Sequence, residues 1–123
     1  MLKITRQGNN NVISAYLKKI KNINWKSILN KYGAEGVKRL SEYTPIDTGK
    51  TASSWGYEVQ KYGDLYKLIF FNNNVVDHVN IACVLQFGHV TNNGGWVEGQ
   101  DYINPALKPI LEKLNDDIWR EIQ

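Results

Sequence analysis

The sequence predicts an α+β fold in a single domain spanning residues 1–123. We expect two N-terminal helices, a small antiparallel sheet of three to four strands, and a C-terminal helix packed on the sheet. Apolar residues recur at helical spacing in the first third of the chain, and from Trp55 they alternate with polar residues as in a strand. Asn104 and Pro105 then form a good helix start, a cap followed by a first-turn proline. This order is typical of helices laid on one face of a sheet.

The two N-terminal helices are predicted over residues 12–23 and 25–43. Asparagines at positions 9–11 offer a cap for the first helix, and Asn24 offers one for the second. Pro45 disfavours helical backbone at the residue before it, so the second helix should end there. The preceding segment "LKITRQG" is a short strand or an ordered arm.

The middle of the chain predicts a hairpin followed by a long loop. Residues 55–60 alternate, "KYGDL" offers a turn at Gly63 and Asp64, and "LYKLIFFN" forms the second strand. The segment "VNIACVLQFG" is either a third strand or a short helix. Residues 88–101, rich in Gly and Asn, form a longer loop than usual, and such loops are commonly functional or disordered. In an isolated subunit we expect this loop to be mobile or an extended, hairpin-like structure.

Composition bounds the possible function classes. The net charge of +3, from 15 basic and 12 acidic residues, favours solubility. A charge of this size does not by itself indicate a nucleic-acid-binding protein. A single cysteine, Cys83, allows no intrachain disulfide and no cysteine-based metal cage. His78 and His89 show no metal-ligand spacing, so we expect neither a metal nor a cofactor. No apolar run resembles a signal peptide or a membrane span, and we expect synthesis in a cytoplasm.

The stretch "TPIDTGKTASSW" admits two catalytic interpretations besides a structural one. A phosphate-binding loop needs a glycine five residues before Gly49, where this chain has Thr44, and it must leave a strand rather than a helix. A dimeric aspartic protease using Asp47 needs two carboxylates that share a proton. Its Asp-Thr-Gly segment should follow an apolar strand, whereas here a helix end and a proline turn precede it.

The structural interpretation explains more of the same stretch, as a turn built on Pro45, Asp47, Thr48 and Gly49. The proline sets φ for a turn, and the aspartate can accept N–H bonds from the residues that follow. The glycine supplies a φ that other residues adopt only with strain. We therefore expect Asp47 to be a turn residue rather than a catalytic acid.

Three segments in order resemble a family of tailed-phage neck proteins. "TPIDTGKTASSW" is similar to the family's turn of proline, any residue, Asp-Thr-Gly, any residue, leucine, two residues and serine. "ACVLQFGHV" resembles its tyrosine-alanine to glutamate-phenylalanine-glycine-threonine segment, and "YINPALKPI" resembles the start of its C-terminal helix. The matches span residues 44–110. This chain departs from the pattern with Thr51 for leucine, Gln86 for glutamate and His89 for threonine.

The resemblance implies a structural role in a head–tail junction, without catalysis or cofactor. The protein would be a tail-completion or head–tail joining component, also called a minor capsid or minor tail protein. It would assemble in the host cytoplasm as a ring and remain in the neck or tail of the virion. Its partners would be other copies, the head connector or adaptor protein, and the tail tube or tail terminator protein. DNA would pass through without specific binding, and no membrane is involved.

A ring needs two different adhesive surfaces on each subunit, because its contacts run head to tail. The candidate interface residues are Trp96 and His89 in the Gly-rich loop and Trp119 on the last helix. We expect Trp25 and Trp55 to pack in the core instead. Two other functions stay open: a nucleic-acid-associated phage protein, marked by basic residues on one face, and the dimeric aspartic protease.

Overall fold

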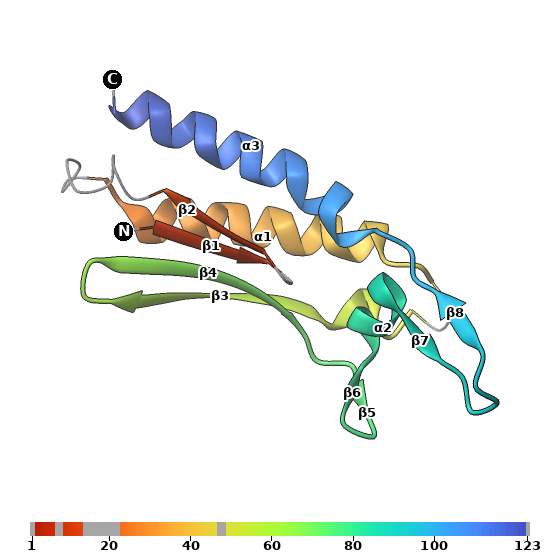
Figure 1. The fold of residues 1–123 in the computed structure, drawn as a ribbon. Helices are drawn as coiled ribbons and strands as arrows, with labels where there is room; N and C mark the ends of the chain where they lie inside the picture. Colours follow the sequence, from red (N-terminus) through yellow and green to blue (C-terminus); the bar gives the residue numbers. More distant parts are fainter. Residues whose placement is uncertain (1, 7–8, 14–22, 47–48, 123) are drawn as a thin grey trace.

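The computed structural model describes residues 2–6, 9–13, 23–46 and 49–122, and its fold class is α+β, as predicted. The helices are α1 (Trp25–Tyr43), α2 (Ile81–Phe87), α3 (Ile103–Ile122) and the short 3-10 turn η2 (Ala52–Ser54). The strands are β1 (Leu2–Arg6), β2 (Asn9–Ile13), β3 (Trp55–Tyr62), β4 (Leu65–Asn72), β5 (Val75–Val76), β6 (Val79–Asn80), β7 (Gly88–Val90) and β8 (Trp96–Glu98). Figure 1 shows α1 and α3 side by side along one face of the sheet, with two small hairpins projecting from one end of the molecule.

The main sheet has four strands in the order β2-β1-β4-β3, and it is mixed rather than antiparallel. The pairs β1–β2 and β3–β4 are antiparallel, but β1 runs parallel to β4. The expectation of an antiparallel sheet was therefore wrong for its central pair. Short hairpin connections impose antiparallel neighbours, whereas a long connection that includes a helix permits parallel ones. Here the chain between β1 and β4 includes α1.

The predicted first helix is also corrected where the structure describes it. Val12 and Ile13 belong to β2, and the asparagines at positions 9–11 pair with β1 instead of capping a helix. Valine and isoleucine favour strands, and two of them cannot by themselves distinguish the two periods. The remainder of that prediction, residues 14–22, lies outside the described residues. Among the described residues, α1 is thus the single helix before the turn motif.

Helix α1 has the predicted bounds and the predicted cap. The side chain of Asn24 accepts a hydrogen bond from the N–H of Ser27 at 3.1 Å, which satisfies one of the first unpaired amides of the helix. At the other end, Thr44 has extended backbone with φ −64° and ψ 127°, as a residue before proline prefers. The β3–β4 hairpin turning at Gly63 and Asp64 is likewise confirmed.

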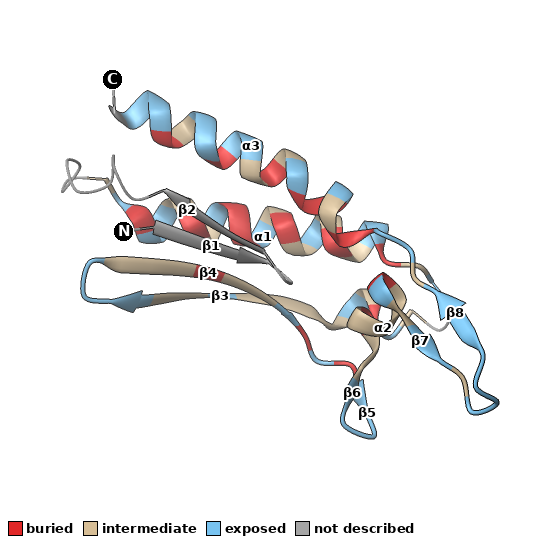
Figure 2. Ribbon diagram, viewed as in Figure 1, coloured by how far each residue is buried: buried red, intermediate tan, exposed pale blue. Residues whose placement is uncertain are grey.

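The core lies between the two long helices and the sheet, and buried residues line the facing sides of α1 and α3 (Figure 2). One cluster joins both helices to Leu68 on β4, and a second lies around Leu40 and Tyr102. Trp25 is buried in the first cluster, and Trp55 packs against the second, as expected. Fully or nearly fully buried residues on α3 are Ile103, Ala106, Leu107, Ile110, Leu114 and Ile118.

Helix α3 begins at Ile103, slightly before the predicted start at Asn104 and Pro105. The side-chain oxygen Oε1 of Gln86 accepts hydrogen bonds from the backbone N–H groups of Tyr102 and Ile103, each at 3.0 Å. These amides at the helix start therefore obtain their acceptor from α2 rather than from a local cap. A cap supplied from another element leaves no local sequence signal.

Candidate assembly interface

The stretch "TPIDTGKTASSW" closes on itself through its first and last residues. The indole Nε1 of Trp55 donates to Oγ1 of Thr44 at 2.8 Å, and that hydroxyl donates in turn to the carbonyl of Leu40 at the end of α1. The Trp55 ring also meets Tyr102 edge to face, with centroids 6.4 Å apart. The turn is thereby fixed to α1 and to the start of α3. Sequence patterns did not single out Thr44 or Trp55 for this role.

Within the turn, Gly49 has φ +82°, the left-handed conformation expected of it. Its carbonyl accepts the N–H of Ser53 at 3.1 Å, which starts the turn into η2. Pro45 is half-buried just beyond α1. The other two residues of the predicted motif, Asp47 and Thr48, lie outside the described residues.

A buried group of polar side chains anchors the first projecting hairpin. Asn72 donates to the carbonyl of Thr51 at 2.8 Å, and Asn74 donates to the hydroxyl of the same threonine at 2.8 Å. Asn80 donates to the carbonyl of Asn72 at 3.2 Å, which joins the two ends of the hairpin. These bonds tie the base of β5–β6 to the segment after the turn motif.

The β5–β6 hairpin itself is short and apolar. Its turn residues Asp77 and His78 both have positive φ, 50° and 66°, the mirror-image turn that matches strand twist. Val75, Val76 and Val79 are all exposed, in a ribbon too short to bury them. Isolated two-stranded ribbons are marginally stable, so this one depends on its anchored base.

The predicted loop at residues 88–101 forms the second hairpin, β7–β8. Gly88, with φ +83°, crosses Gly99 so closely that a Cβ on either residue would overlap backbone atoms of the opposite segment. At the tip, the N–H of Thr91 donates to the carbonyl of Gly95 at 2.9 Å. The hairpin therefore leaves the molecule through a crossing that only glycine permits.

The candidate interface residues Trp96 and His89 lie on this hairpin but on opposite faces of it. Val90 lies across from Trp96, and His89 lies across from Val97, and residues opposite each other share a face. Trp96 is 55% exposed and Val90 is 68% exposed. The ribbon thus has apolar groups on both faces.

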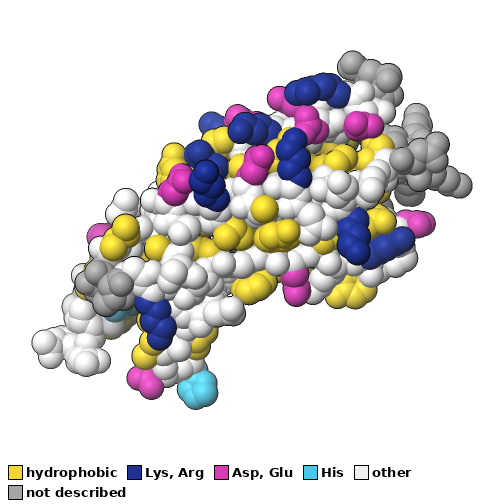
Figure 3. Space-filling view, turned by 180° about the vertical axis from the view of Figure 1, so that it is seen from behind, with side chains coloured by type: hydrophobic (Ala, Val, Ile, Leu, Met, Phe, Trp, Pro, Cys, Tyr) yellow, Lys and Arg dark blue, Asp and Glu magenta, His cyan; other side chains and the backbone are white. Residues whose placement is uncertain are grey.

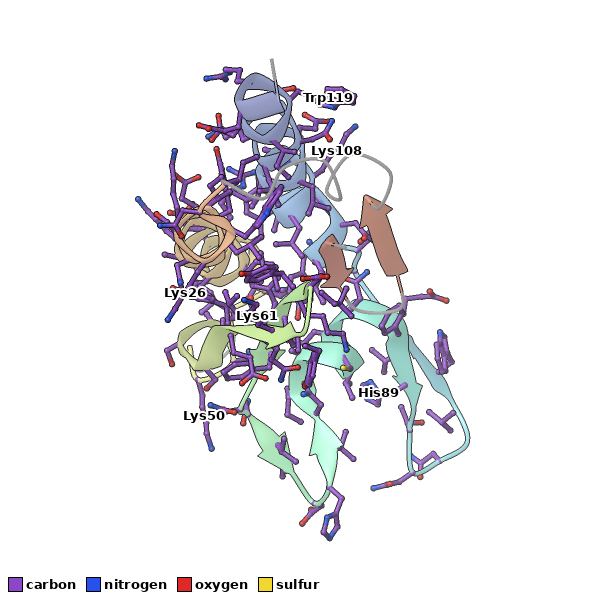
Figure 4. The ribbon with its side chains drawn as sticks, turned by 90° about the vertical axis from the view of Figure 1, so that its left-hand side faces the viewer. Lys26, Lys50, Lys61, His89, Lys108 and Trp119 are labelled. Carbon is purple, nitrogen blue, oxygen red and sulfur yellow. The ribbon has the colours of Figure 1, made fainter. Side chains whose placement is uncertain are left out.

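Trp119, the third candidate, is not part of this surface. It is 38% exposed near the end of α3, at the opposite end of the molecule from the hairpins (Figure 4). Figure 1 shows the end of α3 at the same end of the molecule as the β3–β4 turn, while β5–β6 and β7–β8 project from the other end. The exposed tryptophans therefore mark two separate regions.

The two hairpins lie within a part of the chain that has no lysine or arginine. Residues 68–107 contain three acidic residues, Asp77, Glu98 and Asp101, and no basic residue other than the two histidines. Basic and acidic side chains lie next to each other across the helices, and a basic side chain also lies beside the histidine-bearing hairpin (Figure 3). We call the surface formed by β5–β6, β7–β8 and the exposed Phe87 the hairpin end.

A pair of ionisable groups with shifted pKa values lies away from the hairpin end, between α1 and α3. The Tyr32 hydroxyl donates a short hydrogen bond to Asp117. Burial, and then this bond, raise the pKa of Tyr32 to about 12. The same hydrogen bond is the main cause that lowers the pKa of Asp117, helped by Lys31 and Arg120. This pair cross-links two helices and has the features of a structural contact.

Across the described segments, no group of three His, Cys, Asp or Glu side chains could hold a metal ion. None of the described helices combines the length and apolar character needed to cross a bilayer. No family model, curated protein or solved structure matches this chain. The features of this chain that bear on its function are therefore the geometry of the hairpin end and the three sequence motifs.

Proposed function

We propose that this protein is a structural component of a tailed-phage or prophage head–tail junction. It acts as a tail-completion or head–tail joining protein, in a ring between the head connector and the tail tube. The observation that carries the proposal is the hairpin end, where two ribbons expose apolar side chains: Val75, Val76 and Val79 on β5–β6, and Val90, Trp96 and Val97 on β7–β8. Exposed apolar ribbons on a rigid core are suited to binding another protein surface. The three motif resemblances supply the biological setting.

The chemistry of the hairpin end favours a protein partner over DNA. Binding to nucleic acid depends on Lys and Arg contacts with phosphates, and residues 68–107 contain neither. Exposed aromatic and aliphatic groups instead supply the apolar centre of a protein interface. In this proposal, DNA passes through the ring without binding to this surface. The role needs no cofactor and no catalytic residue.

Trp96 is the proposed anchor of the contact. Tryptophan is enriched among residues that dominate binding energy, because it buries a large apolar area with few rotatable bonds. Its surroundings in the free subunit are Val90 and the glycine crossing, which leave half of the side chain in water. Burial of that ring against a neighbour would stabilise the assembled state far more than the free subunit.

The proposal is tested by Trp96→Ala in a phage or prophage that encodes this chain. We expect full heads and complete tails to accumulate unattached, seen by electron microscopy. The free energy of unfolding of the purified variant should lie within about 0.5 kcal/mol of the wild-type value, because the site is exposed. Trp96→Phe is the matched control, because it keeps an apolar ring and should retain most attachment. Normal virions from Trp96→Ala, or a strongly destabilised subunit, would refute the role of this residue.

A further inference from the structure

The unequal distribution of charge bears on how copies of this chain meet. Residues 68–107 carry three negative charges and no Lys or Arg, while all 15 basic and the other nine acidic residues lie outside that range. Lys50 is exposed beside the base of β5–β6, so the β7–β8 segment with Glu98 and Asp101 is the part of the hairpin end that is negative throughout. Two β7–β8 ribbons facing each other would bring like charges together, which costs binding energy. A hairpin end facing the remainder of a second copy meets net positive charge. This distribution favours head-to-tail contact over a two-fold symmetric one.

One face of β7–β8 combines an aromatic, an aliphatic and an acidic side chain. Trp96 and Val90 lie opposite each other, and Glu98 lies two residues from Trp96 along the strand, so all three share a face. All three are exposed. This face presents an apolar centre with a carboxylate at its edge.

The outer sheet face at the opposite end of the molecule carries an aromatic, an aliphatic and a basic side chain, with the acidic Glu58 hydrogen-bonded to Gln60 on the side away from the turn. Tyr62 and Leu65 pair across the β3–β4 turn, and Lys67 pairs with Gln60 on the same face. Along each strand these residues alternate with residues that face the core, such as Val59 on β3 and Leu68 on β4. They therefore lie on the sheet face that points away from the core. Tyr62 is 59% exposed, and its hydroxyl donates to Gln60 at 2.7 Å, which holds the ring in place. Figure 3 shows basic, apolar and acidic side chains next to each other at the end away from the histidine-bearing hairpin.

We propose that the Val90–Trp96–Glu98 face of one copy docks on the Tyr62–Leu65–Lys67 face of the next copy. Each partner contributes one large aromatic and one aliphatic side chain, and Glu98 meets Lys67 at the edge. The two faces lie at opposite ends of an elongated subunit, so the contact repeats from copy to copy and can close into a ring. This inference rests on the proposed function, because it identifies the subunit contact of the proposed ring.

The experiment measures self-association of the full chain by sedimentation equilibrium up to about 1 mM, where even weak contacts are populated. Wild type should associate with increasing concentration. Glu98→Lys and Lys67→Glu should each weaken association about tenfold. The double variant Glu98→Lys/Lys67→Glu should restore it, because opposite charges again face each other. Lys113→Glu, the same charge change in the middle of α3, is the control and should have no effect.

A second measurement separates head-to-tail from symmetric contact without charge changes. Trp96→Ala and Tyr62→Ala should each be monomeric, but their mixture should form a one-to-one dimer that grows no further. Only one intact pair of faces remains in that mixture. A monomeric wild type, charge variants that match Lys113→Glu, or a mixture that stays monomeric would overturn the inference.

The two proposals fail in different ways. If tail attachment requires the protein but association ignores these faces, the neck function stands and this contact is wrong. If the faces govern association but virions form without the protein, the contact stands and the neck function is wrong.

Discussion

Gly36 shows how a single missing side chain fixes the distance between α1 and the sheet. A Cβ at this position would overlap the ring of Phe70, which packs against both core clusters and so has little room to move. Gly36→Ala gains about 1 kcal/mol of helix propensity but overpacks the core, which typically costs about 1–3 kcal/mol. We expect net destabilisation, measured as a lower urea midpoint. Combining it with Phe70→Leu should relieve the clash, and a more stable single variant would contradict this account.

Thr44 has a comparable effect through one hydroxyl. It accepts the Trp55 indole N–H and closes the turn motif. Thr44→Val keeps the shape but leaves that half-buried N–H without its acceptor, at a cost of about 1–3 kcal/mol. Thr44→Ser keeps the hydroxyl, so its free energy of unfolding should fall much less. Thermal unfolding of the pair distinguishes the hydrogen bond from packing, and equal losses would argue for packing alone.

At the scale of elements, the Tyr32–Asp117 bond makes the packing of α1 on α3 depend on pH. The pKa of Asp117 in the folded protein is lowered from 3.8. The ionised carboxylate therefore stabilises the fold above pH 3.8, and this stabilisation is lost as the pH falls through the lowered pKa. The pKa of Tyr32 in the folded protein is raised from 10.0 to about 12. The protonated hydroxyl therefore stabilises the fold below pH 10, and this stabilisation is lost as the pH rises from 10 to about 12. Stability from this pair is therefore greatest at neutral pH.

Tyr32→Phe should remove this pH dependence. We expect the free energy of unfolding to fall by about 1 kcal/mol at pH 7. The difference in stability between variant and wild type should be smaller at both pH 3 and pH 11. Melting temperatures across that range provide the measurement. Tyr62→Phe, at an exposed position, is the control and should follow wild type throughout. A difference that stays constant with pH would show that the hydrogen bond is not the cause.

Gly88 determines how the β7–β8 hairpin leaves the core. Its φ of +83° and its crossing with Gly99 exclude a side chain. Gly88→Ala should therefore disrupt the hairpin while sparing the helices and the main sheet. Hydrogen exchange should show faster exchange for β7–β8 amides and unchanged protection in α1. Gly94→Ala, at a tip glycine with a similar φ of +79° but open space around it, imposes the backbone strain without the overlap and should perturb the hairpin less.

At the scale of the whole molecule, the sequence predicted what local patterns encode. Helix α1 with its Asn24 cap and the β3–β4 hairpin follow from periodicity and turn chemistry within a few residues. The pairing of β1 with β4 and the capping of α3 by Gln86 depend on residues distant in sequence, which no local period reveals. The same limit applies to the site. Trp96 and His89 were linked by proximity in the chain, but their opposite faces followed from strand register alone.

The parallel pairing of β1 with β4 also sets the order of events during synthesis. The first strand of the chain finds its inner neighbour only after more than half of the protein has been made, since Leu2 pairs with Tyr66. Contacts so distant in sequence slow folding, because the chain must close a large loop before the contact forms. While the ribosome is still extending the chain, β1 has only β2 to pair with, and a two-stranded ribbon is marginally stable. The nascent chain therefore completes its main sheet late, after β4 has emerged.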